Sequence, residues 1–514
     1  MDKFALGGNC MKRKFRILTL VVLLLCAMTA CKQKKEENIN QANEVKNIIF
    51  MIGDGMGYNA IDAAEVYYQD ELNGEKLTMN QLPVQGSHTT YSMTNQVTDS
   101  AAGGTALSTG YKTGNKVVAK STDKTTEFKT TLELAAEKGK STGVVVTTPI
   151  VDATPATFTA HVDNREEYET IAAQQLEKLA NGTLDLALGG GSVYYECDEN
   201  QSKLDAAKKA GVTYTNVWED TKKASLPVVG LYAEESMDTT DDTMPTIAEM
   251  TDYALGKLSQ NENGFFLMVE GAQIDDFAEY NNLEMQLHEI YEFDRAVAVA
   301  KKYVEEHPDT ILIVTADHET GDVENPMVQS TDKVLEETTY STQLHTYKSV
   351  PIYAMGTRTE ELAGTHENTD VGAFVASILG ETEFGAKSTT QVIVEYSEEK
   401  TMNGTYELPM TELEEGTKEL KGIKVLHVTV ENKTNDTLRL PVLQFTFRKE
   451  QYEIEPQKSY IAPGETIQID YPISEKVWDR KMMSNISNVV LKAEDESATY
   501  VLKDIGVTSR TGIK

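Results

Sequence analysis

The chain has 514 residues, of which 40% are apolar and 25% are charged, and its formal net charge is −33. This length exceeds one ordinary domain, and the composition is typical of a globular protein and excludes an intrinsically disordered one. So strong a negative charge excludes nucleic acid as a partner, because a duplex would be repelled. It does not exclude a small anionic substrate, since bound metal ions can dominate the local field.

The amino terminus has the pattern of a targeting segment. Basic residues at positions 12–16 precede an apolar run at Ile17–Met28, which is too short to span a membrane comfortably. The run ends close to Cys31, in a pattern that resembles a bacterial lipoprotein signal with cleavage before the cysteine. We therefore expect a signal at residues 1–30, a lipid anchor at Cys31, a tether at residues 31–44 and an extracytoplasmic, membrane-anchored location. The alternative is a plain secretory signal.

From residue 45 onward, short apolar runs alternate with helical patterns, the clearest of which are Thr246–Gln260 and Leu283–Glu305. Continuous apolar runs rich in β-branched residues are typical of strands that are buried on both faces, as in a parallel sheet. We expect residues 45–385 to form an α/β domain with a central, mostly parallel sheet and helices on both faces. The expected strands lie at residues 47–52, 143–147, 184–188, 265–269, 310–315 and 350–355.

After residue 385 the pattern changes to short β-rich runs. Turn signals such as Asn435-Asp436 and Pro463-Gly464 separate them. This pattern predicts a second domain at residues 386–514, a small all-β sandwich of immunoglobulin-like form. No group of residues in it indicates a chemical activity.

Acidic residues and a histidine follow three of the expected strands. Asp54 follows the first run, Glu270 and Asp275 follow the fourth, and Asp317 and His318 follow the fifth. Because the carboxyl ends of parallel strands meet at one edge of a sheet, we expect these side chains to converge there. One such acid could be a solvated loop residue, but three positions together predict a binding site.

A serine stands where a loop gives way to an expected helix. Ser100 begins the helical pattern, so its hydroxyl gains from the partial positive charge of the helix end. Asp99 beside it could orient a guanidinium, and Arg165 offers a planar fork that suits two phosphate oxygens. A serine is a poor nucleophile unless a base or a metal lowers its pKa, and the strand-end acids could hold such a metal.

Taken together, five sequence blocks in order resemble the alkaline phosphatase family over residues 45–385. The resemblance implies a metal-dependent phosphoric monoester hydrolase that forms a phosphoserine at Ser100, with Arg165 and Asp99 at the substrate. It also implies phosphate monoesters as substrates and a homodimer. The blocks are Asp54-Gly55-Met56-Gly57, Thr98-Asp99-Ser100-Ala101-Ala102, Asp152-Ala153-Thr154-Pro155-Ala156 with Arg165, Val269-Glu270-Gly271-Ala272-Gln273-Ile274-Asp275, and Thr315-Ala316-Asp317-His318-Glu319-Thr320.

The resemblance also implies three metal ions, two Zn²⁺ and one Mg²⁺. The implied ligands of the zinc that activates Ser100 are Asp54, Asp317 and His318. Those of the magnesium are Asp54, Thr154 and Glu270, with Asp152 in its water shell. Those of the second zinc, which polarises the leaving oxygen, include Asp275 and His345.

The second zinc site departs from the family pattern. Tyr347 replaces the glycine of a His-Thr-Gly block after His345, and His366 is a competing candidate for that ligand. Glu279 stands where the family has a histidine four residues after Asp275. A glutamate can bind zinc at about 2.0–2.2 Å, so we expect Glu279 to be a ligand, with a less electrophilic zinc or a harder ion such as magnesium or manganese. The alternative is that Glu279 is solvated and this metal is weak or missing.

Two other functions stay open at this point. A phosphodiesterase of the same superfamily is one, because two-metal sites serve both classes of ester. The other is a surface binding protein on a decayed phosphatase fold, which only Glu279 and Tyr347 support.

Overall fold

The computed structural model describes the α/β part almost continuously and, beyond it, a set of strands. The expected signal, the tether and Cys31 lie outside the described residues. Within the described part, no helix has the length and apolar character needed to cross a membrane. The described residues are 45–326, 330–382, 384–385, 390–400, 423–432, 438–439, 443–447, 450–454, 460–462, 465–473, 490–493, 499–501 and 503–506.

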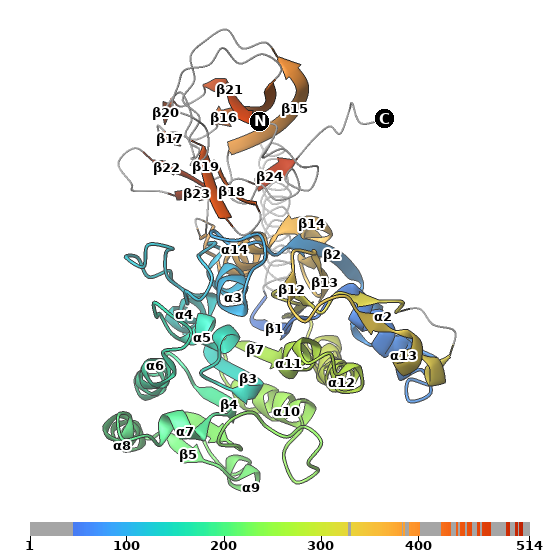
Figure 1. The fold of residues 1–514 in the computed structure, drawn as a ribbon. Helices are drawn as coiled ribbons and strands as arrows, with labels where there is room; N and C mark the ends of the chain where they lie inside the picture. Colours follow the sequence, from blue (N-terminus) through green and yellow to red (C-terminus); the bar gives the residue numbers. More distant parts are fainter. Residues whose placement is uncertain are drawn as a thin grey trace, which may run out of the picture.

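A ten-stranded sheet organises the α/β part (Figure 1). The seven strands from β8 to β5 are parallel, β13 is antiparallel to both β8 and β2, and β14 is parallel to β2. In spatial order the strands are β14 (Gly364–Glu367), β2 (Val84–Thr89), β13 (Val350–Met355), β8 (Thr310–Thr315), β1 (Asn47–Gly53), β7 (Phe265–Gly271), β3 (Ser141–Pro149), β4 (Leu186–Gly190), β6 (Val228–Leu231) and β5 (Thr213–Thr215).

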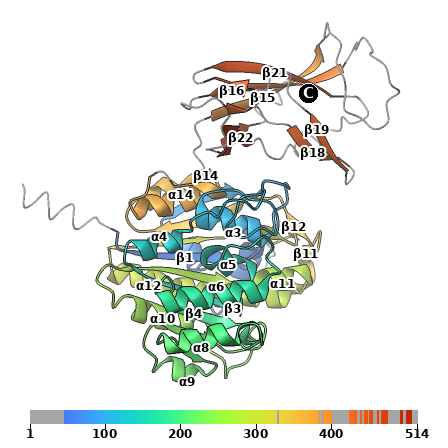
Figure 2. The same cartoon turned by 90° about the vertical axis from the view of Figure 1, so that its left-hand side faces the viewer.

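Helices cover both faces of this sheet, as predicted. Strand β1 is buried along its whole length, and its side chains alternate between two apolar cores: Ile48 and Phe50 join one, Ile49 and Met51 the other. Figures 1 and 2 place the helices of the two cores on opposite sides of the sheet. On one side are α3 (Ser100–Thr109), α4 (Thr131–Glu137), α5 (Ala153–Thr159), α6 (Tyr168–Asn181), α8 (Gln201–Lys209) and α14 (Asn368–Ile378); on the other are α2 (Tyr58–Tyr67), α10 (Ile247–Leu258) and α12 (Leu283–Glu306).

Local sequence explains where the long helices begin. Helix α10 starts with a capping box, in which Thr246 accepts from the backbone N–H of Glu249 while Glu249 reaches back to the N-cap. Helix α12 is capped by Asn282. The helices predicted at Thr246–Gln260 and Leu283–Glu305 differ by at most two residues at either end from the observed α10 and α12. The remaining short helices are α7 (Ser192–Tyr195), α9 (Trp218–Thr221), α11 (Gln273–Glu279) and α13 (Thr331–Glu337).

The strand predictions were good at the centre of the sheet and poorer away from it. The run expected at 184–188 is wrong by two residues, because β4 continues through Gly189 and Gly190. Glycine is required there, since a Cβ on Gly190 would lie 2.0 Å from the carbonyl oxygen of Glu235. Strand β2 was missed because its sequence, Val-Gln-Gly-Ser-His-Thr, is polar.

Among the described residues after 385, the elements are strands (Figure 1). One sheet has the order β21-β16-β15-β24, a second β20-β17-β22-β23, and β18 pairs with β19. Their bounds are β15 (Thr390–Lys400), β16 (Ile423–Asn432), β17 (Leu438–Arg439), β18 (Leu443–Phe447), β19 (Glu450–Ile454), β20 (Tyr460–Ile461), β21 (Thr466–Ile473), β22 (Val490–Ala493), β23 (Thr499–Val501) and β24 (Lys503–Gly506).

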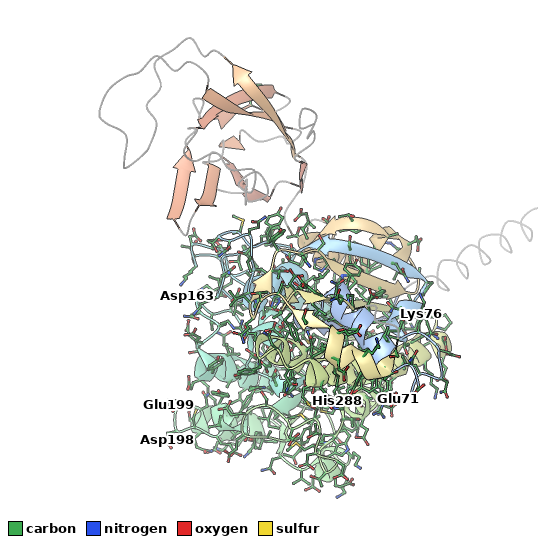
Figure 3. The ribbon with its side chains drawn as sticks, turned by 45° about the vertical axis from the view of Figure 1, so that its right-hand side comes forward. Glu71, Lys76, Asp163, Asp198, Glu199 and His288 are labelled. Carbon is green, nitrogen blue, oxygen red and sulfur yellow. The ribbon has the colours of Figure 1, made fainter. Side chains whose placement is uncertain are left out.

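The excess of acidic residues lies largely at the surface of the α/β part. Glu71, Asp198 and Glu199 are exposed on its periphery (Figure 3). Solvated charges of this kind contribute little to the stability of the fold. The acids at the carboxyl edge of the sheet differ from them, because they are buried.

Candidate metal centre and active site

The carboxyl edge of the sheet gathers the predicted site residues. Asp54 follows β1, Glu270 lies near the end of β7, and Asp317 follows β8, so parallel register brings their backbones together. All three side chains are at most 5% exposed. Since burying an ionised carboxylate without a partner is costly, such a group needs protons or bound cations.

Ser100 is the first residue of α3, and its position is fixed by Asp99. One carboxylate oxygen of Asp99 accepts from the backbone N–H of Ala102 at 3.0 Å and thereby caps the helix. The other accepts from the backbone N–H of Lys116, also at 3.0 Å. Gly103 lets the helix approach the strand ends closely, because a Cβ there would lie 2.9 Å from the carbonyl oxygen of Asp317.

Four polar atoms converge beside Ser100. The Nε2 atom of His318 lies 3.2 Å from Ser100 Oγ, 3.3 Å from Asp54 Oδ1 and 3.4 Å from Asp317 Oδ2. The two carboxylate oxygens are buried and have no hydrogen-bond partner. Thr320 Oγ1 donates to Asp275, so it accepts from His318 Nδ1–H at 3.2 Å, which leaves Nε2 as the atom with a free lone pair.

Electrostatics make this cluster unfavourable without a cation. Burial, followed by the charge of Asp317, raises the pKa of Asp54 well above its usual value. Burial and the nearby Asp275 raise the pKa of Asp317 to about 6. Burial lowers the pKa of His318 to about 3, so the imidazole is neutral and suited to ligation. An O,O,N donor set with unpaired lone pairs fits zinc.

A second group of donors surrounds His345. Its Nε2 atom lies 3.5 Å from Asp275 Oδ2 and 3.5 Å from Glu279 Oε1, while its Nδ1–H donates to the carbonyl of Thr98 at 2.9 Å. Burial lowers the pKa of His345, but hydrogen bonds with Asp275 and Glu279 outweigh it and raise the pKa to about 11. Donor atoms of Asp275, His318 and His345 lie within 4.8 Å of one another, and Glu279 does not belong to that set.

The structure separates His345 from its competitor His366. His366 lies in the edge strand β14, and its Nε2 bonds to the carbonyl of Ala363 at 3.0 Å. His345 instead lies in the two-residue strand β12 (His345–Thr346), which pairs with β9 (Glu319–Thr320) directly after His318. This pairing is what brings His345 to the cluster.

A third group lies between β7 and the start of α5. Glu270 Oε2 and Thr154 Oγ1 are buried without a hydrogen-bond partner. Burial, followed by the charge of Asp152, raises the pKa of Glu270 well above its usual value. Asp152 is the N-cap of α5 and is partly exposed, so it could contact an ion through water. Oxygen donors of this kind fit magnesium.

Arg165 connects the serine to this third group. Its Nη1 donates to Ser100 Oγ at 3.3 Å, and its Nη2 donates to Asp152 Oδ1 at 2.9 Å. Asp99 lies 3.7 Å from the guanidinium. Burial opposes the charge of Arg165, but Asp152 and Asp99 raise its pKa above the ordinary value, so the side chain stays cationic beside the serine hydroxyl.

Thr320 and Thr98 have positions in the site that sequence reasoning missed. Both act through hydrogen bonds, Thr320 to His318 and Asp275, and Thr98 to His345. No charge or spacing marked them, although Thr98 and Thr320 lie inside the blocks already singled out.

A buried serine hydroxyl beside a fixed guanidinium, with three groups of donor atoms at the edge of a parallel sheet, is an arrangement typical of metal-dependent hydrolases of α/β architecture. The profile of the family described as alkaline phosphatase matches residues 45–338. Alkaline phosphatase 3 of Bacillus subtilis (strain 168) is 34% identical over 304 residues, 57% of this chain and 64% of that relative, which is less than two thirds of its length.

Solved structures agree with this assignment. The alkaline phosphatase of the Antarctic bacterium TAB5 is 30% identical, has a TM-score of 0.59, and is matched over 67% of this chain and 99% of its own. A variant of that enzyme, described with Mg bound in its M3 site, is 31% identical with a TM-score of 0.58 over the same shares. The chain belongs to the alkaline phosphatase family. The predicted family and its α/β fold are confirmed.

Proposed function

We propose that this protein hydrolyses small-molecule phosphate monoesters through a covalent phosphoserine at Ser100. The observation that carries the proposal is the convergence of Ser100 Oγ, Asp54 Oδ1 and Asp317 Oδ2 on His318 Nε2, within 3.2 to 3.4 Å, with both carboxylate oxygens unpartnered. Such an arrangement has little structural value by itself, because unpartnered buried carboxylates destabilise a fold.

The donor groups suit the metals that the resemblance implies. Bound there, these ions would lower the pKa of the serine hydroxyl and offset charge on phosphoryl and leaving oxygens. The proposed ligands of the first zinc are Asp54, Asp317 and His318. Those of the second zinc are Asp275, His345 and Glu279. Those of magnesium are Asp54, Thr154 and Glu270, with Asp152 through water.

The side chains support two in-line displacements. Ser100 loses its proton as Oγ bonds to phosphorus, the ester bond breaks, and the alcohol leaves with a proton. Water then attacks phosphorus, the bond to Oγ breaks, and phosphate leaves as the hydroxyl is restored. Arg165, held by Asp152 and Asp99, is placed to bind phosphoryl oxygens from the side of Ser100, where charge builds up in both transition states.

Matched substrates test this function. Rates on a phosphate monoester and on the diester with the same leaving group are compared for wild type and for Ser100→Ala. We expect faster monoester turnover that is lost in the variant. Faster diester turnover would favour the related diesterase function. A protein that holds no tight divalent metal, and is inactive when zinc and magnesium are supplied, would favour a binding protein on a decayed fold.

We also propose that the chain is a lipoprotein outside the cytoplasm, anchored through Cys31, with an immunoglobulin-like sandwich at residues 386–514. The basic and apolar pattern before Cys31 supports the anchor, and the β-rich pattern supports the sandwich. Mass spectrometry of the mature amino terminus, beside Cys31→Ala, tests the anchor. The homodimer implied by the family is likewise a proposal, which sedimentation would test.

A further inference from the structure

Arg165 lies in an irregular stretch of chain, so secondary structure alone does not fix its position. This arginine segment, residues 160–167, connects α5 with α6. It lies against a second irregular stretch, residues 116–120, which we call the support segment. The backbone N–H of Arg165 donates to the carbonyl of Lys116 at 2.7 Å, and an isolated β-bridge adds two backbone hydrogen bonds of 3.1 and 3.2 Å. The two segments therefore hold each other.

The support segment also fixes the position of Ser100. The backbone N–H of Lys116 donates to Asp99 Oδ2 at 3.0 Å, and Asp99 caps the helix that begins with Ser100. Lys116 thus bonds to the helix cap through its N–H and to Arg165 through its carbonyl. The conformation of this segment sets the serine and the guanidinium relative to each other.

The backbone of the support segment is strained. Lys116 and Ala119 have positive φ angles of 70° and 47°. Residues with a Cβ rarely adopt this left-handed conformation, and they keep it only where surrounding contacts outweigh its cost. The N–H of Ala119 donates to Thr105 Oγ1 of α3 at 2.9 Å, and its carbonyl accepts from the backbone N–H of Phe128 at 2.8 Å and from His161. The shape of the segment therefore depends on these contacts.

His161 connects the two segments through its side chain. Its Nδ1–H donates to the carbonyl of Ala119 at 3.0 Å, and its Nε2 lies 2.9 Å from Glu133 Oε1. The backbone of His161 is held as well, because its N–H donates to Gln174 Oε1 at 2.8 Å and its carbonyl accepts from Gln174 Nε2 at 3.0 Å. The imidazole is 11% exposed. Main chain and side chain of this residue are therefore both fixed.

Glu133 attaches His161 to two helices. It is the third residue of α4, where it forms a capping box with Thr130, and it pairs with Lys178 of α6. Burial raises the pKa of Glu133, but the hydrogen bonds and charges of His161 and Lys178 outweigh it and lower the pKa to about 2. Helices α4 and α6 both pack against α5 (Figure 1). His161 is thus anchored to a regular part of the domain.

Two ion pairs also join the segments, but they are more exposed than the link through His161. Lys116 pairs with Glu166, and Lys120 pairs with Asp163; the acids of these pairs are 57% and 49% exposed. Exposed pairs contribute little to the stability of an arrangement, because water screens them. The buried contacts of His161 are better suited to hold the arginine segment in place.

We propose that His161 is a positioning residue for Arg165, which holds the guanidinium within reach of a phosphoryl group at Ser100. The inference rests on the proposed function, in which Arg165 binds phosphoryl oxygens. His161 acts through the backbone of the two segments. Arg165 Nη1 lies 3.3 Å from Ser100 Oγ, and Asp152 holds only the other terminal nitrogen, so a shift of the arginine segment would move the guanidinium away from the serine.

Phosphate binding by variants of His161 tests the proposal. His161→Phe keeps an aromatic ring but removes both nitrogens, and it should raise the Kd of inorganic phosphate roughly fivefold in calorimetric titration of the metal-loaded protein. KM for p-nitrophenyl phosphate should rise in parallel while kcat changes less than about twofold. His161→Gln keeps one N–H donor group and should have a smaller effect of the same kind. Elemental analysis should show unchanged metal content.

A double-mutant cycle separates positioning from a general structural role. In an Arg165→Ala background no guanidinium remains to be positioned, so His161→Phe should leave the phosphate Kd unchanged within about 1.5-fold. Two controls match the substitutions. Glu137→Gln alters a lysine-paired acid of α4, and His307→Gln alters an exposed histidine that contacts the carbonyl of Tyr303 at 2.9 Å; both should leave the Kd unchanged.

The failures of the two proposals are distinguishable. A fivefold effect that persists in the Arg165→Ala background, or a lower Tm with unchanged phosphate Kd, overturns the positioning role. If His161→Phe does not fold, His161→Gln decides by the same cycle. A metal-loaded protein that binds phosphate but hydrolyses no monoester overturns the proposed function, and its phosphate Kd values still decide whether His161 acts through Arg165. A metal-loaded protein that binds no phosphate overturns both.

Discussion

The imidazole rings of His318 and His345 stack on each other, with centroids 3.7 Å apart and planes 20° from parallel. Each ring is fixed through its Nδ1 atom, His318 by Thr320 and His345 by Thr98. Each therefore presents Nε2 to its own set of carboxylates. The stack holds two donor groups side by side, which is the arrangement that two neighbouring metal ions require.

Metal removal should destabilise the fold, because Asp54 and Asp317 place unpartnered carboxylate oxygens in a buried site. We expect chelation to lower Tm and zinc with magnesium to restore it. In the metal-free protein Asp54→Asn should raise Tm by roughly 2–4 °C, since it removes a buried charge, whereas in the loaded protein it should lower Tm. Differential scanning calorimetry of both states checks this. A lower Tm for Asp54→Asn in both states would contradict the argument, and the surface variant Asp198→Asn is the control.

The proposed nucleophile, Ser100, is tested beside another serine of the same helix. Ser100→Ala should lower kcat by on the order of 1,000-fold, because no side-chain oxygen remains to receive phosphate. Ser108→Ala, in the same helix, removes a hydroxyl that donates to the carbonyl of Thr157 at 2.8 Å and should leave kcat nearly unchanged. Acid quenching with labelled substrate should trap phosphate on wild type and on Ser108→Ala alone. Label retained by Ser100→Ala would show that another residue is phosphorylated.

Glu279 is the residue that tests the proposed second zinc site. Its carboxylate lies 3.5 Å from His345 Nε2 yet is half exposed, so it is poised between ligand and solvated side chain. We expect Glu279→Ala to lose metal from this site and Glu279→His to shift its preference toward zinc, because imidazole is a better zinc ligand than carboxylate. Elemental analysis after dialysis measures both effects. If metal content and rate match wild type in both variants, Glu279 is not a ligand; Glu284→Ala, an exposed acid at the start of α12, is the control.

Sequence alone predicted the part of the site that topology determines. Asp54, Glu270 and Asp317 follow or end buried parallel strands, and the carboxyl ends of such strands must meet. Ser100 was recognisable because Asp99 and a helical pattern adjoin it. These positions depend on local periodicity and on one rule of sheet architecture, so no tertiary detail was needed.

Tertiary pairing determines the rest, and it leaves little trace in the sequence. His345 reaches the cluster only because β12 pairs with β9, an arrangement of two residues on each side that no periodicity indicates. The resemblance, not the residue pattern, pointed to it. Strand β2 was missed for a related reason. A Cβ on Gly86 would lie 2.1 Å from the carbonyl oxygen of Leu362, so the chain packs there by close backbone contact. Such a position carries no apolar side chain that could mark the strand in the sequence.

Replacing Arg165 even by lysine should weaken the binding of the phosphoryl group. Its two terminal nitrogens contact Ser100 and Asp152 separately, and a single ammonium cannot reproduce that fork. We expect Arg165→Lys to raise KM for a monoester about tenfold and to weaken inhibition by inorganic phosphate in parallel. Arg358→Lys, which alters a guanidinium paired with Glu361 on the surface, is the matched control. Unchanged KM and phosphate inhibition in Arg165→Lys would remove the arginine from the substrate site.

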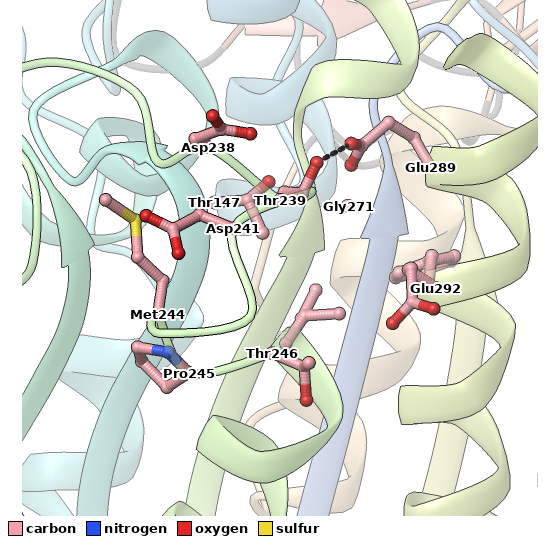
Figure 4. A pocket seen from close by; sticks show the side chains of 12 residues that line it. Thr147, Asp238, Thr239, Asp241, Met244, Pro245, Thr246, Gly271, Glu289 and Glu292 are labelled. Carbon is pink, nitrogen blue, oxygen red and sulfur yellow. Dashed lines mark hydrogen bonds between the residues drawn. The ribbon is translucent and has the colours of Figure 1, made fainter.

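Glu289 should make stability depend on pH. This residue of α12 is 2% exposed and accepts a hydrogen bond from Thr239 (Figure 4). Burial, opposed by the Thr239 bond, raises its pKa to about 7 from an ordinary 4.5. The folded state holds this proton more tightly than the unfolded state. The contribution of Glu289 to the free energy of unfolding is therefore complete below about pH 4.5 and is lost as the pH rises through 7.

The difference between the folded-state pKa of Glu289, about 7, and its ordinary value of 4.5 sets the size of this effect on stability. Between pH 4.5 and pH 8 the wild type should lose about 3 kcal/mol of unfolding free energy through Glu289, whereas Glu289→Gln carries no titrating group and should not lose it. Urea unfolding of metal-free wild type and variant at pH 5 and pH 8 measures the difference, and comparison at each pH cancels the titration of the metal-site acids. Glu284→Gln, an exposed acid at the start of the same helix, should behave as wild type. Parallel pH profiles for wild type and Glu289→Gln would mean that Glu289 is charged in the folded protein, with a cation or water supplying what Thr239 alone does not.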